Sequence, residues 1–489
     1  MSNNILSINL EDLAKYFPDD FSEQELAAGQ TLLLKKLSIV LHRFYNGKIQ
    51  VIPKAGIYGF NWFNIWYTPG VSAVSTAIRD NNALSYELTN RGNAVAIVSD
   101  STRVLGDGDC TPSGGLGVME GKALLMKILG GIDAIPLCID SRDRSGKSDP
   151  DKIIDFVRMV QYSFGAVNLE DISQPNCYRV LDTLREECEI PVWHDDAQGT
   201  ASVTLAGLIN ALKLVDKKIG DVKVVFLGAG ASNTAIARIC ITAGLDPQQV
   251  IMFDAKGSLN IDRRDIEGDP ALYRKWEICQ STNPGKIKEI EEALRGADVL
   301  IALSKPGPDS IKPEWISLMN KQPIVFACAN PVPEIYPYAA RKAGAYIVAT
   351  GRGDFPNQVN NSLGFPGILK GALIVRAKKI SDLMAIAAAR SLAEFAEMRG
   401  ITPDNIIPNM NETEVFPLEA AAVARQAIKE GLARKVLSDQ EVVSIARYDI
   451  EVARESYHLL SDKSIIPQPD MEIIKKTLLE VIEEIRKSR

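Results

Sequence analysis

Short apolar runs that end in acidic or polar residues recur through the middle of the chain, with helical stretches between them. They lie within residues 93–196 and again within residues 222–351. This alternation is the pattern of parallel βαβ units, in which catalytic and binding groups collect where strands hand over to loops. The chain is therefore predicted to be an α/β protein with two parallel sheets.

The length of 489 residues is too great for one ordinary domain, and 46% hydrophobic content allows large buried cores. Residues 1–50 form a predicted helical extension, closed at Gly47, that packs or contacts another subunit. A first α/β domain (51–197) and a second (198–375) follow. Residues 376–489 are predicted helical, and their last helix is either a solvated amphipathic helix or a dimer surface.

The composition excludes several classes of partner. A net charge of −7 gives no basic field for nucleic acid, and no stretch approaches about 18 uninterrupted apolar residues, as a membrane span would need. The N-terminus lacks a basic region followed by a long apolar core, which favours the cytoplasm. The expected partners are small molecules, without nucleic acid and without a membrane.

The sequence from Gly228 to Asn233, GAGASN, stands between a predicted strand and a predicted helix. Gly228 would allow a tight turn, and Gly230 would allow a pyrophosphate to approach the helix N-terminus. Asn233 replaces the third glycine of GxGxxG, which normally permits close packing of helix and strand. Asp254 ends the next strand and favours NAD over NADP, although Lys256 weakens that preference. The alternative is a glycine turn that serves packing alone.

Two acidic pairs follow neighbouring predicted strands, Glu170 with Asp171 and Asp195 with Asp196. Their repulsion at one sheet edge would be relieved by Mg²⁺ or Mn²⁺, which prefer oxygen ligands. Neighbours on an extended chain face opposite ways, so Asp195 and Asp196 are not both expected to bind the metal. The alternative is a set of helix N-caps and solvated loops. Seven cysteines without CxxC spacing indicate reduced thiols, and three histidines make a histidine metal site improbable.

Lys122 follows a glycine-containing stretch that leads into a helix. The stretch is not a Walker A loop, because Leu116 and Ala123 occupy positions that the motif reserves for other residues. We expect Lys122 in the first helical turn, where the helix dipole and burial would lower its pKa and favour a base. The alternative is a surface lysine.

Two further stretches have simpler interpretations. An aromatic run over 60–66 ends at Tyr67 and a Pro-Gly turn, and the residues alone predict that Tyr67 closes an aromatic core patch. Residues 141–151, SRDRSGKSDPD, are charged and contain glycine, which predicts a solvated loop.

Seven motifs occur in this order: YTPGVS, VMEGK, NLEDI, HDDAQGTA, GAGAS, CANPVPE and PNQVNNSLGFPG. Together they resemble the malic enzymes, particularly the short bacterial and archaeal form, over about residues 45–375. The resemblance implies an N-terminal catalytic domain that binds substrate and a Rossmann-type, doubly wound domain that binds NAD or NADP. It also implies oxidative decarboxylation of (S)-malate to pyruvate and CO₂ with Mg²⁺ or Mn²⁺.

The resemblance implies a role for each matched residue. Tyr67 is similar to the general acid, Lys122 to the general base, and Asp195 to the aspartate that supports the lysine. The implied metal ligands are Glu170, Asp171 and Asp196. The implied cofactor-binding residues are Gly228, Ala229, Gly230, Ala231, Ser232, Asp254 and Asn330. The implied substrate-binding residues are Arg103, Lys122, Asn330 and Asn361.

Some features depart from the pattern of the short members. These are Asn233, the stretch 106–115 and the insert 141–151, while Arg103 is similar to an arginine of the longer members that holds a malate carboxylate. In the family the stretch 106–115 borders the substrate, so its departure leaves open which organic acid is the substrate.

The chemistry suits these residue types. Oxidation of a secondary alcohol needs a base, which Lys122 with Asp195 could supply as hydride leaves for nicotinamide. A metal would stabilise the enolate that forms as CO₂ departs, and a rigidly held Tyr67 could deliver the last proton. Malolactic conversion to lactate with bound NAD and a non-catalytic nucleotide-binding regulator are the alternatives. A homodimer or larger homo-oligomer is expected by analogy, while effectors and the role of the tail after 375 stay open.

Overall fold

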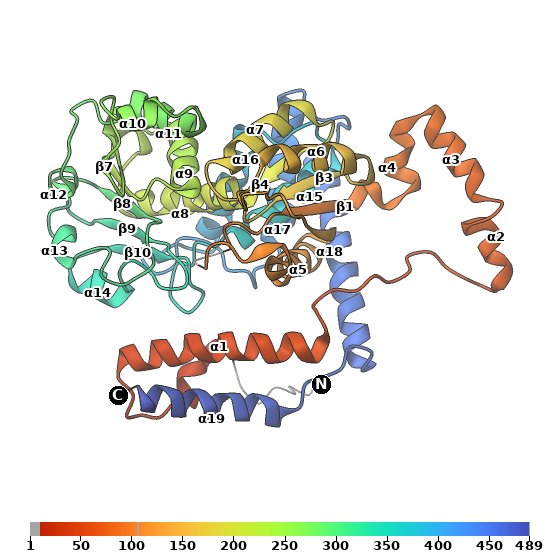
Figure 1. Cartoon of the computed structure of the whole chain (residues 1–489), viewed down its shortest axis with the longest axis horizontal. Helices are drawn as coiled ribbons and strands as arrows, with labels where there is room; N and C mark the ends of the chain where they lie inside the picture. Colours follow the sequence, from red (N-terminus) through yellow and green to blue (C-terminus); the bar gives the residue numbers. More distant parts are fainter. Residues whose placement is uncertain (1–9, 105–106, 489) are drawn as a thin grey trace. The chain divides into compact units, whose positions relative to one another are not determined.

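The computed structural model describes residues 10–104 and 107–488. The chain separates into two compact units. One consists of residues 1–52 together with 452–489, and the other of residues 53–451 (Figure 1).

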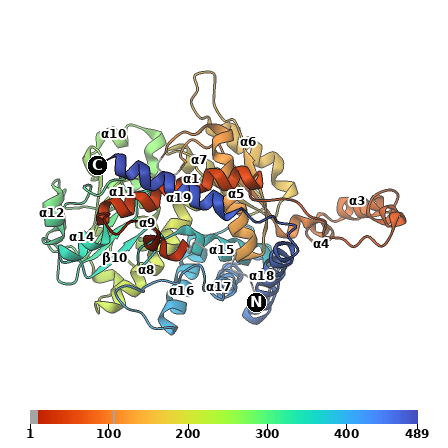
Figure 2. The ribbon, with the colours of Figure 1, turned by 90° about the horizontal axis from the view of Figure 1, so that it is seen from below.

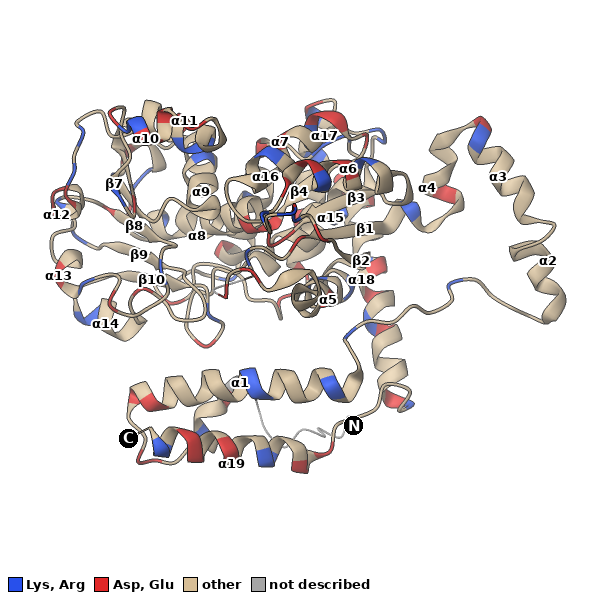
Figure 3. Cartoon of the chain, in the orientation of Figure 1, with Lys and Arg blue, Asp and Glu red and all other residues tan. Residues whose placement is uncertain are grey.

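The smaller unit is a helical pair formed by the two ends of the chain. Helices α1 (Glu23–Tyr45) and α19 (Met471–Lys487) lie side by side (Figures 1 and 2). Leu33 and Val481 share its core, and Lys36 Nζ lies 2.6 Å from Glu484 Oε2. The apolar face of the last helix therefore covers α1, and basic and acidic residues are interspersed along both helices (Figure 3).

The ends of α1 follow from its sequence. Ser22 and Glu25 form a capping box that satisfies free N–H groups of the first turn. Asn46 adopts a left-handed conformation with φ +55°, and Gly47 follows with φ +107°, so the helix stops where the sequence predicts.

The first sheet of the larger unit has the order β2-β1-β3-β4, and all its pairings are parallel. Its strands are β1 (Ala94–Ser99), β2 (Asp133–Cys138), β3 (Ala166–Leu169) and β4 (Val192–His194). The crossover helices are α5 (Thr111–Gly130), α6 (Pro150–Val160) and α7 (Asn176–Glu187).

The second sheet has the order β10-β9-β8-β5-β6-β7. Its strands are β5 (Val224–Leu227), β6 (Val250–Asp254), β7 (Gly257–Ser258), β8 (Val299–Ala302), β9 (Ile324–Ala327) and β10 (Ile347–Thr350). All pairings are parallel except β6 with β7. The order reverses between β5 and β8, where a doubly wound sheet opens a crevice for a ligand. The predicted α/β class is confirmed, and among the strands of the described residues the two-residue β7 alone is not predicted by the sequence.

The helices of the second sheet are α9 (Ala231–Thr242), α10 (Arg264–Glu267), α11 (Tyr273–Ser281), α12 (Ile290–Leu294), α13 (Pro313–Ile316) and α14 (Pro337–Lys342). Helix α8 (Thr200–Leu214) joins the two sheets and is apolar on nearly every side. Such a helix must be buried. Asn210 Nδ2 donates to the carbonyls of Ala393 and Ile406, each at 2.9 Å, so α8 packs within the C-terminal helices.

The C-terminal helices are α15 (Phe365–Ile374), α16 (Asp382–Met398), α17 (Val415–Lys429) and α18 (Asp439–Asp462). Helices α16, α17, α18 and α19 confirm the predicted helical segment after residue 375, whereas α15 lies before it. Among the described residues, no helix combines the length and apolar character needed to cross a bilayer.

The segment before the first sheet contains α2 (Phe63–Trp66), α3 (Val71–Asp80) and α4 (Ser85–Leu88). We call residues 53–80 the aromatic arm. Helices α2 and α3 of this arm project away from the two sheets (Figure 1).

The insert 141–151 is only in part the solvated loop that its composition predicts. Residues 143–147 are exposed, but the hydroxyls of Ser141 and Ser148 donate to Asp100 Oδ2 at 2.7 and 2.6 Å. Arg142 also pairs with Asp109. The base of the insert is therefore anchored to the loop after β1, because its serines satisfy a buried carboxylate.

The helical pair makes a testable prediction. Leu33→Ala removes a fully buried side chain and should lower the free energy for opening α1 by about 2–5 kcal/mol, measured by hydrogen exchange of the α1 amides. Leu34→Ala is the matched control, because Leu34 is 45% exposed, and its effect should stay within about 0.5 kcal/mol. Equal effects of the two variants would contradict this packing.

Candidate active site

Carboxylates meet at the carboxyl ends of β3 and β4. These strands are parallel neighbours, with Leu169 opposite His194, so the residues directly after them share one sheet edge. One oxygen from each of Glu170, Asp171 and Asp196 can be chosen so that all three lie within 4.8 Å of one another. Oxygen ligands at this spacing could hold a hard divalent cation such as Mg²⁺ or Mn²⁺.

The surroundings of this carboxylate cluster make a cation favourable. Glu170 and Asp171 are buried, and burial raises the pKa of Glu170, an effect strengthened by the nearby Asp196. Asp196 Oδ2 accepts the backbone N–H of Asp171 at 2.8 Å, and Asn168 Nδ2 donates to Glu170 Oε2 at 2.9 Å. Hydrogen bonds within the protein therefore hold these oxygen donors in place.

Lys122 lies beside the carboxylate cluster. Its Nζ donates to Asp195 Oδ2 and, at 3.2 Å, to Asn361 Oδ1, and it lies 3.1 Å from Glu170 Oε1. The side chain is buried, so the alternative of a surface lysine is wrong.

Two expectations about Lys122 require correction. Helix α5 begins at Thr111, so Lys122 lies in its second half and not in its first turn. The glycines before it belong to this helix and not to a loop. Gly115 packs against Ser101, and a Cβ on Gly115 would lie 1.9 Å from the Ser101 hydroxyl. Burial alone would lower the pKa of Lys122, but Asp195, Glu170 and Asp196 outweigh burial and raise it well above its ordinary value.

Asp195 and Asp196 point to different partners, but not for the reason that the sequence suggested. They do not continue the extended strand; they begin a π-helical turn, Asp195–Gly199. Asp195 faces Lys122, whereas Asp196 faces the backbone of Asp171.

Two further residues contact the Lys122–Asp195 pair. Trp193 Nε1 donates to Asp195 Oδ1 at 3.3 Å, and Lys122 Nζ lies 4.7 Å from the centre of the buried Phe365 ring. Trp193 lies in β4 and Asp195 begins the π-helical turn that follows it, so the contact depends on how the chain turns at the end of the strand. No local pattern in the sequence indicates the Phe365 contact.

Arg103 and Asn330 lie on loops. The backbone N–H of Arg103 donates to the carbonyl of Asp171 at 3.0 Å, and its exposed side chain therefore starts beside the carboxylate cluster. Asn330 is exposed in the loop after β9, three residues beyond its end at Ala327. Residue 106, the first of the atypical stretch 106–115, lies outside the described residues.

The glycine loop after β5 matches the needs of a dinucleotide. Gly228 has φ +98°, and a Cβ there would lie 2.4 Å from the carbonyl oxygen of Leu303, in the loop after β8. A Cβ at Gly230 would extend into open space beside the uncapped N-terminus of α9. A pyrophosphate could therefore approach these N–H groups closely.

Asn233 fits the turn although it replaces a glycine. Its buried Nδ2 donates to the carbonyls of Leu227 and Gly228, at 3.0 and 2.9 Å, and so stabilises the turn itself. Ser232 Oγ donates to the Asp196 carbonyl at 2.8 Å, which joins the glycine loop to the carboxylate cluster.

Tyr67 is not close to this site within one chain. It follows α2 on the aromatic arm and is 71% exposed, beside Phe60 at 86% and Trp66 at 47%. Its backbone N–H donates to the carbonyl of Phe63, and its carbonyl accepts a hydrogen bond from the N–H of Val71, each at 2.8 Å. The expectation that Tyr67 closes an aromatic core patch is wrong, because these rings project from the sheets and are not packed in a core.

Comparison with known proteins identifies the family. The family model described as "Malic enzyme, N-terminal domain" matches residues 48–185. The model described as "Malic enzyme, NAD binding domain" matches residues 197–428. The chain belongs to the malic enzyme family. The crystal structure of Entamoeba histolytica malic enzyme is 62% identical, with a TM-score of 0.95, and the match covers 98% of this chain and 99% of that one.

Bacterial malic enzymes are also similar. The NAD-dependent malic enzyme of Geobacillus stearothermophilus is 42% identical over 80% of this chain and 78% of its own length. The bifunctional malic/malolactic enzyme of Bacillus subtilis is 40% identical over 85% of this chain and 98% of its own length. Other relatives are described as NADP-dependent.

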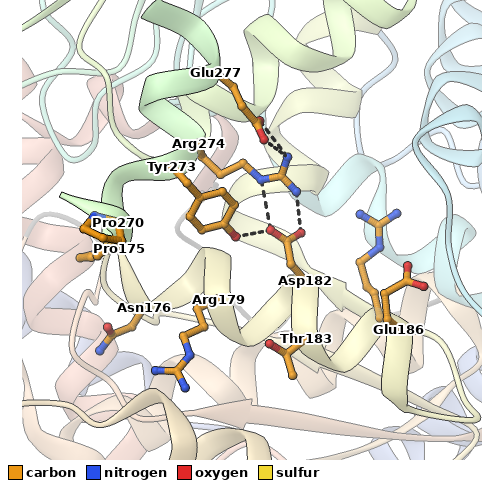
Figure 4. A pocket seen from close by; sticks show the side chains of 12 residues that line it. Pro175, Asn176, Arg179, Asp182, Thr183, Glu186, Pro270, Tyr273, Arg274 and Glu277 are labelled. Atoms are coloured by element: carbon orange, nitrogen blue, oxygen red, sulfur yellow. Dashed lines mark hydrogen bonds and ion pairs between the residues drawn. The ribbon is translucent and has the colours of Figure 1, made fainter. Parts of the chain in front are cut away.

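This malic enzyme also has a cavity of about 650 Å³ between α7 and α11. Asp182 of α7 accepts hydrogen bonds from Tyr273 and, at 2.7 Å, from Arg274 Nη2, both on the cofactor side (Figure 4). Its lining contains none of the carboxylate cluster. The hydrogen bonds beside this cavity connect α7, a helix of the first sheet, to α11, a helix of the second.

The glycine loop of this malic enzyme can be tested with two alanine variants. Gly228→Ala should lower the melting temperature, because alanine is strained at φ +98° and meets Leu303. Gly230→Ala should keep the melting temperature but weaken NADH binding, measured by nicotinamide fluorescence, because its methyl group fills the open approach. If Gly230→Ala binds NADH as tightly as wild type, this loop does not bind the pyrophosphate.

Proposed function

We propose that this malic enzyme oxidatively decarboxylates (S)-malate to pyruvate and CO₂ while reducing NAD or NADP, with Mg²⁺ or Mn²⁺. The main support is one arrangement: a buried Lys122–Asp195 pair next to Glu170, Asp171 and Asp196. The bond from Ser232 to Asp196 brings the glycine loop to the same place.

In this proposal Lys122 takes the proton from the malate hydroxyl. Asp195 and Asn361 hold its Nζ, while the Phe365 ring closes one side of it. A cation bound by Glu170, Asp171 and Asp196 would polarise the C2 oxygen, stabilise the enolate, and offset the carboxylate charge that keeps Lys122 protonated.

The remaining predicted residues would bind the substrate. Arg103, beside Asp171, would pair with a malate carboxylate, and Asn330 and Asn361 would donate hydrogen bonds to substrate or cofactor. Malate and pyruvate are the proposed small-molecule partners.

We propose further that the functional form is a homodimer in which Tyr67 comes from the second copy. The general acid must reach C3 of a substrate bound near Lys122, yet Tyr67 lies on the projecting aromatic arm (Figure 1). Exposed aromatic rings on such an arm are typical of a protein interface. A two-fold pair would complete both sites at once.

Malolactic conversion is a second candidate, because the Bacillus subtilis relative is described as bifunctional. Lactate with no net absorbance change at 340 nm would identify it.

The first test is an initial-rate assay of the purified protein with malate, Mn²⁺ and each nicotinamide. Turnover should require the cation and disappear in EDTA. Lys122→Ala should abolish turnover and keep NADH affinity. Lys127→Ala, a partly exposed lysine of the same helix, should behave as wild type. Wild-type turnover in Lys122→Ala would remove Lys122 from the mechanism.

The shared site can be tested by mixing two inactive variants. Tyr67→Phe and Lys122→Ala should each be inactive alone. Co-refolded or co-expressed dimers should regain roughly a quarter of wild-type activity, since about half of the dimers are mixed and half of the sites in each mixed dimer are intact. Tyr67→Phe mixed with Tyr67→Ala is the control and should regain none. If every mixture stays inactive while mixed dimers form, Tyr67 does not act across subunits.

A further inference from the structure

The acidic residue at the end of β6 is not free. In dinucleotide-binding folds a carboxylate here accepts hydrogen bonds from the adenosine ribose and repels a 2′-phosphate. Both oxygens of Asp254 accept hydrogen bonds from Arg263, Oδ1 from Nη1 and Oδ2 from Nη2, each at 2.9 Å. The backbone N–H of Lys256 also donates to Oδ1 at 2.9 Å.

Arg263 is fixed in this position by a second carboxylate. Its Nε and Nη2 donate to Asp265, at 2.8 and 3.0 Å, so the guanidinium lies between two aspartates with 13% of its side chain exposed. Bidentate pairing of this kind uses the planar fork of arginine, and lysine cannot reproduce it. The charge of Asp254 is therefore compensated by a group that does not lose its proton.

Two lysines add positive charge around this pair. Lys256 Nζ lies 3.1 Å from Asp265 Oδ2 on the exposed side. Lys275 of α11 is half-buried; burial lowers its pKa, and the charge of Asp254 counteracts this effect. Three cations thus accompany two carboxylates at the end of β6, and the local charge is positive. A phosphate that carries about two negative charges at neutral pH would be attracted to this region.

We propose that Arg263 is a specificity-determining residue that, by compensating Asp254, lets the site accept the 2′-phosphate of NADP as well as the ribose hydroxyls of NAD. The inference rests on the proposed function, because it requires a dinucleotide on the Gly228–Asn233 loop. Without Arg263, Asp254 stands uncompensated and selects NAD.

The test compares the dissociation constants of NADH and NADPH for the full chain, measured by nicotinamide fluorescence without malate or metal. Wild type should bind NADPH within about tenfold of NADH, and Arg263→Leu should weaken NADPH relative to NADH by at least tenfold. Arg264→Leu is the matched control, because Arg264 is exposed and pairs with Glu267 rather than with Asp254; it should leave the ratio unchanged. An unchanged ratio in Arg263→Leu, or NADPH binding more than about a hundredfold weaker in wild type, overturns the inference.

A second variant keeps the test decisive if Arg263→Leu fails to fold. Asp254→Asn retains the arginine and removes the negative charge, so it should shift the ratio toward NADPH; no shift overturns the inference. Failure of the proposed function looks different. If the protein binds nucleotide but does not oxidise malate, the proposed function is refuted, and the ratio of NADPH to NADH affinity still tests the role of Arg263. If wild type binds neither nucleotide, the proposed function and the role of Arg263 are both refuted.

Discussion

Repulsion among carboxylates at one sheet edge is the constraint on which the rest of the site depends. Glu170, Asp171, Asp195 and Asp196 follow two parallel strands and cannot separate, because the register of β3 and β4 brings their ends together. The chain offsets this charge with one buried ammonium, that of Lys122. One lysine beside four carboxylates leaves an excess of negative charge at this edge, which a further cation would offset.

The fold brings the dinucleotide loop to this charged edge through a single connection. Helix α8 begins directly after the Asp195–Gly199 turn and runs into the second sheet, where β5 leads to the glycine loop. Ser232 then bonds back to Asp196. The carboxylate cluster and the glycine loop are thus near in space because a largely buried helix and this hydrogen bond link them.

The sequence could predict those parts of the molecule that depend on local pattern. Strands that end in acidic pairs, the Gly228 turn and the helical C-terminal segment all have such patterns. The environment of Lys122 could not be predicted, because it depends on Asn361 and Phe365, which are more than two hundred residues away in the chain. The glycines before it looked like a loop, whereas Gly115 is small because a neighbouring serine leaves no room. The pairing of Arg263 with Asp254 was missed for a different reason, since an ion pair between the end of a strand and a nearby loop leaves no periodicity in the sequence.

The pairing of the first helix with the last has a consequence for synthesis. Lys36 and Glu484 are 448 residues apart, so α1 leaves the ribosome long before its partner exists. Until then, Leu33 and Leu37 have no native neighbour from α19. Contacts between such distant segments form late and slowly. The nascent chain therefore carries α1 without its partner helix until that distant segment has been translated.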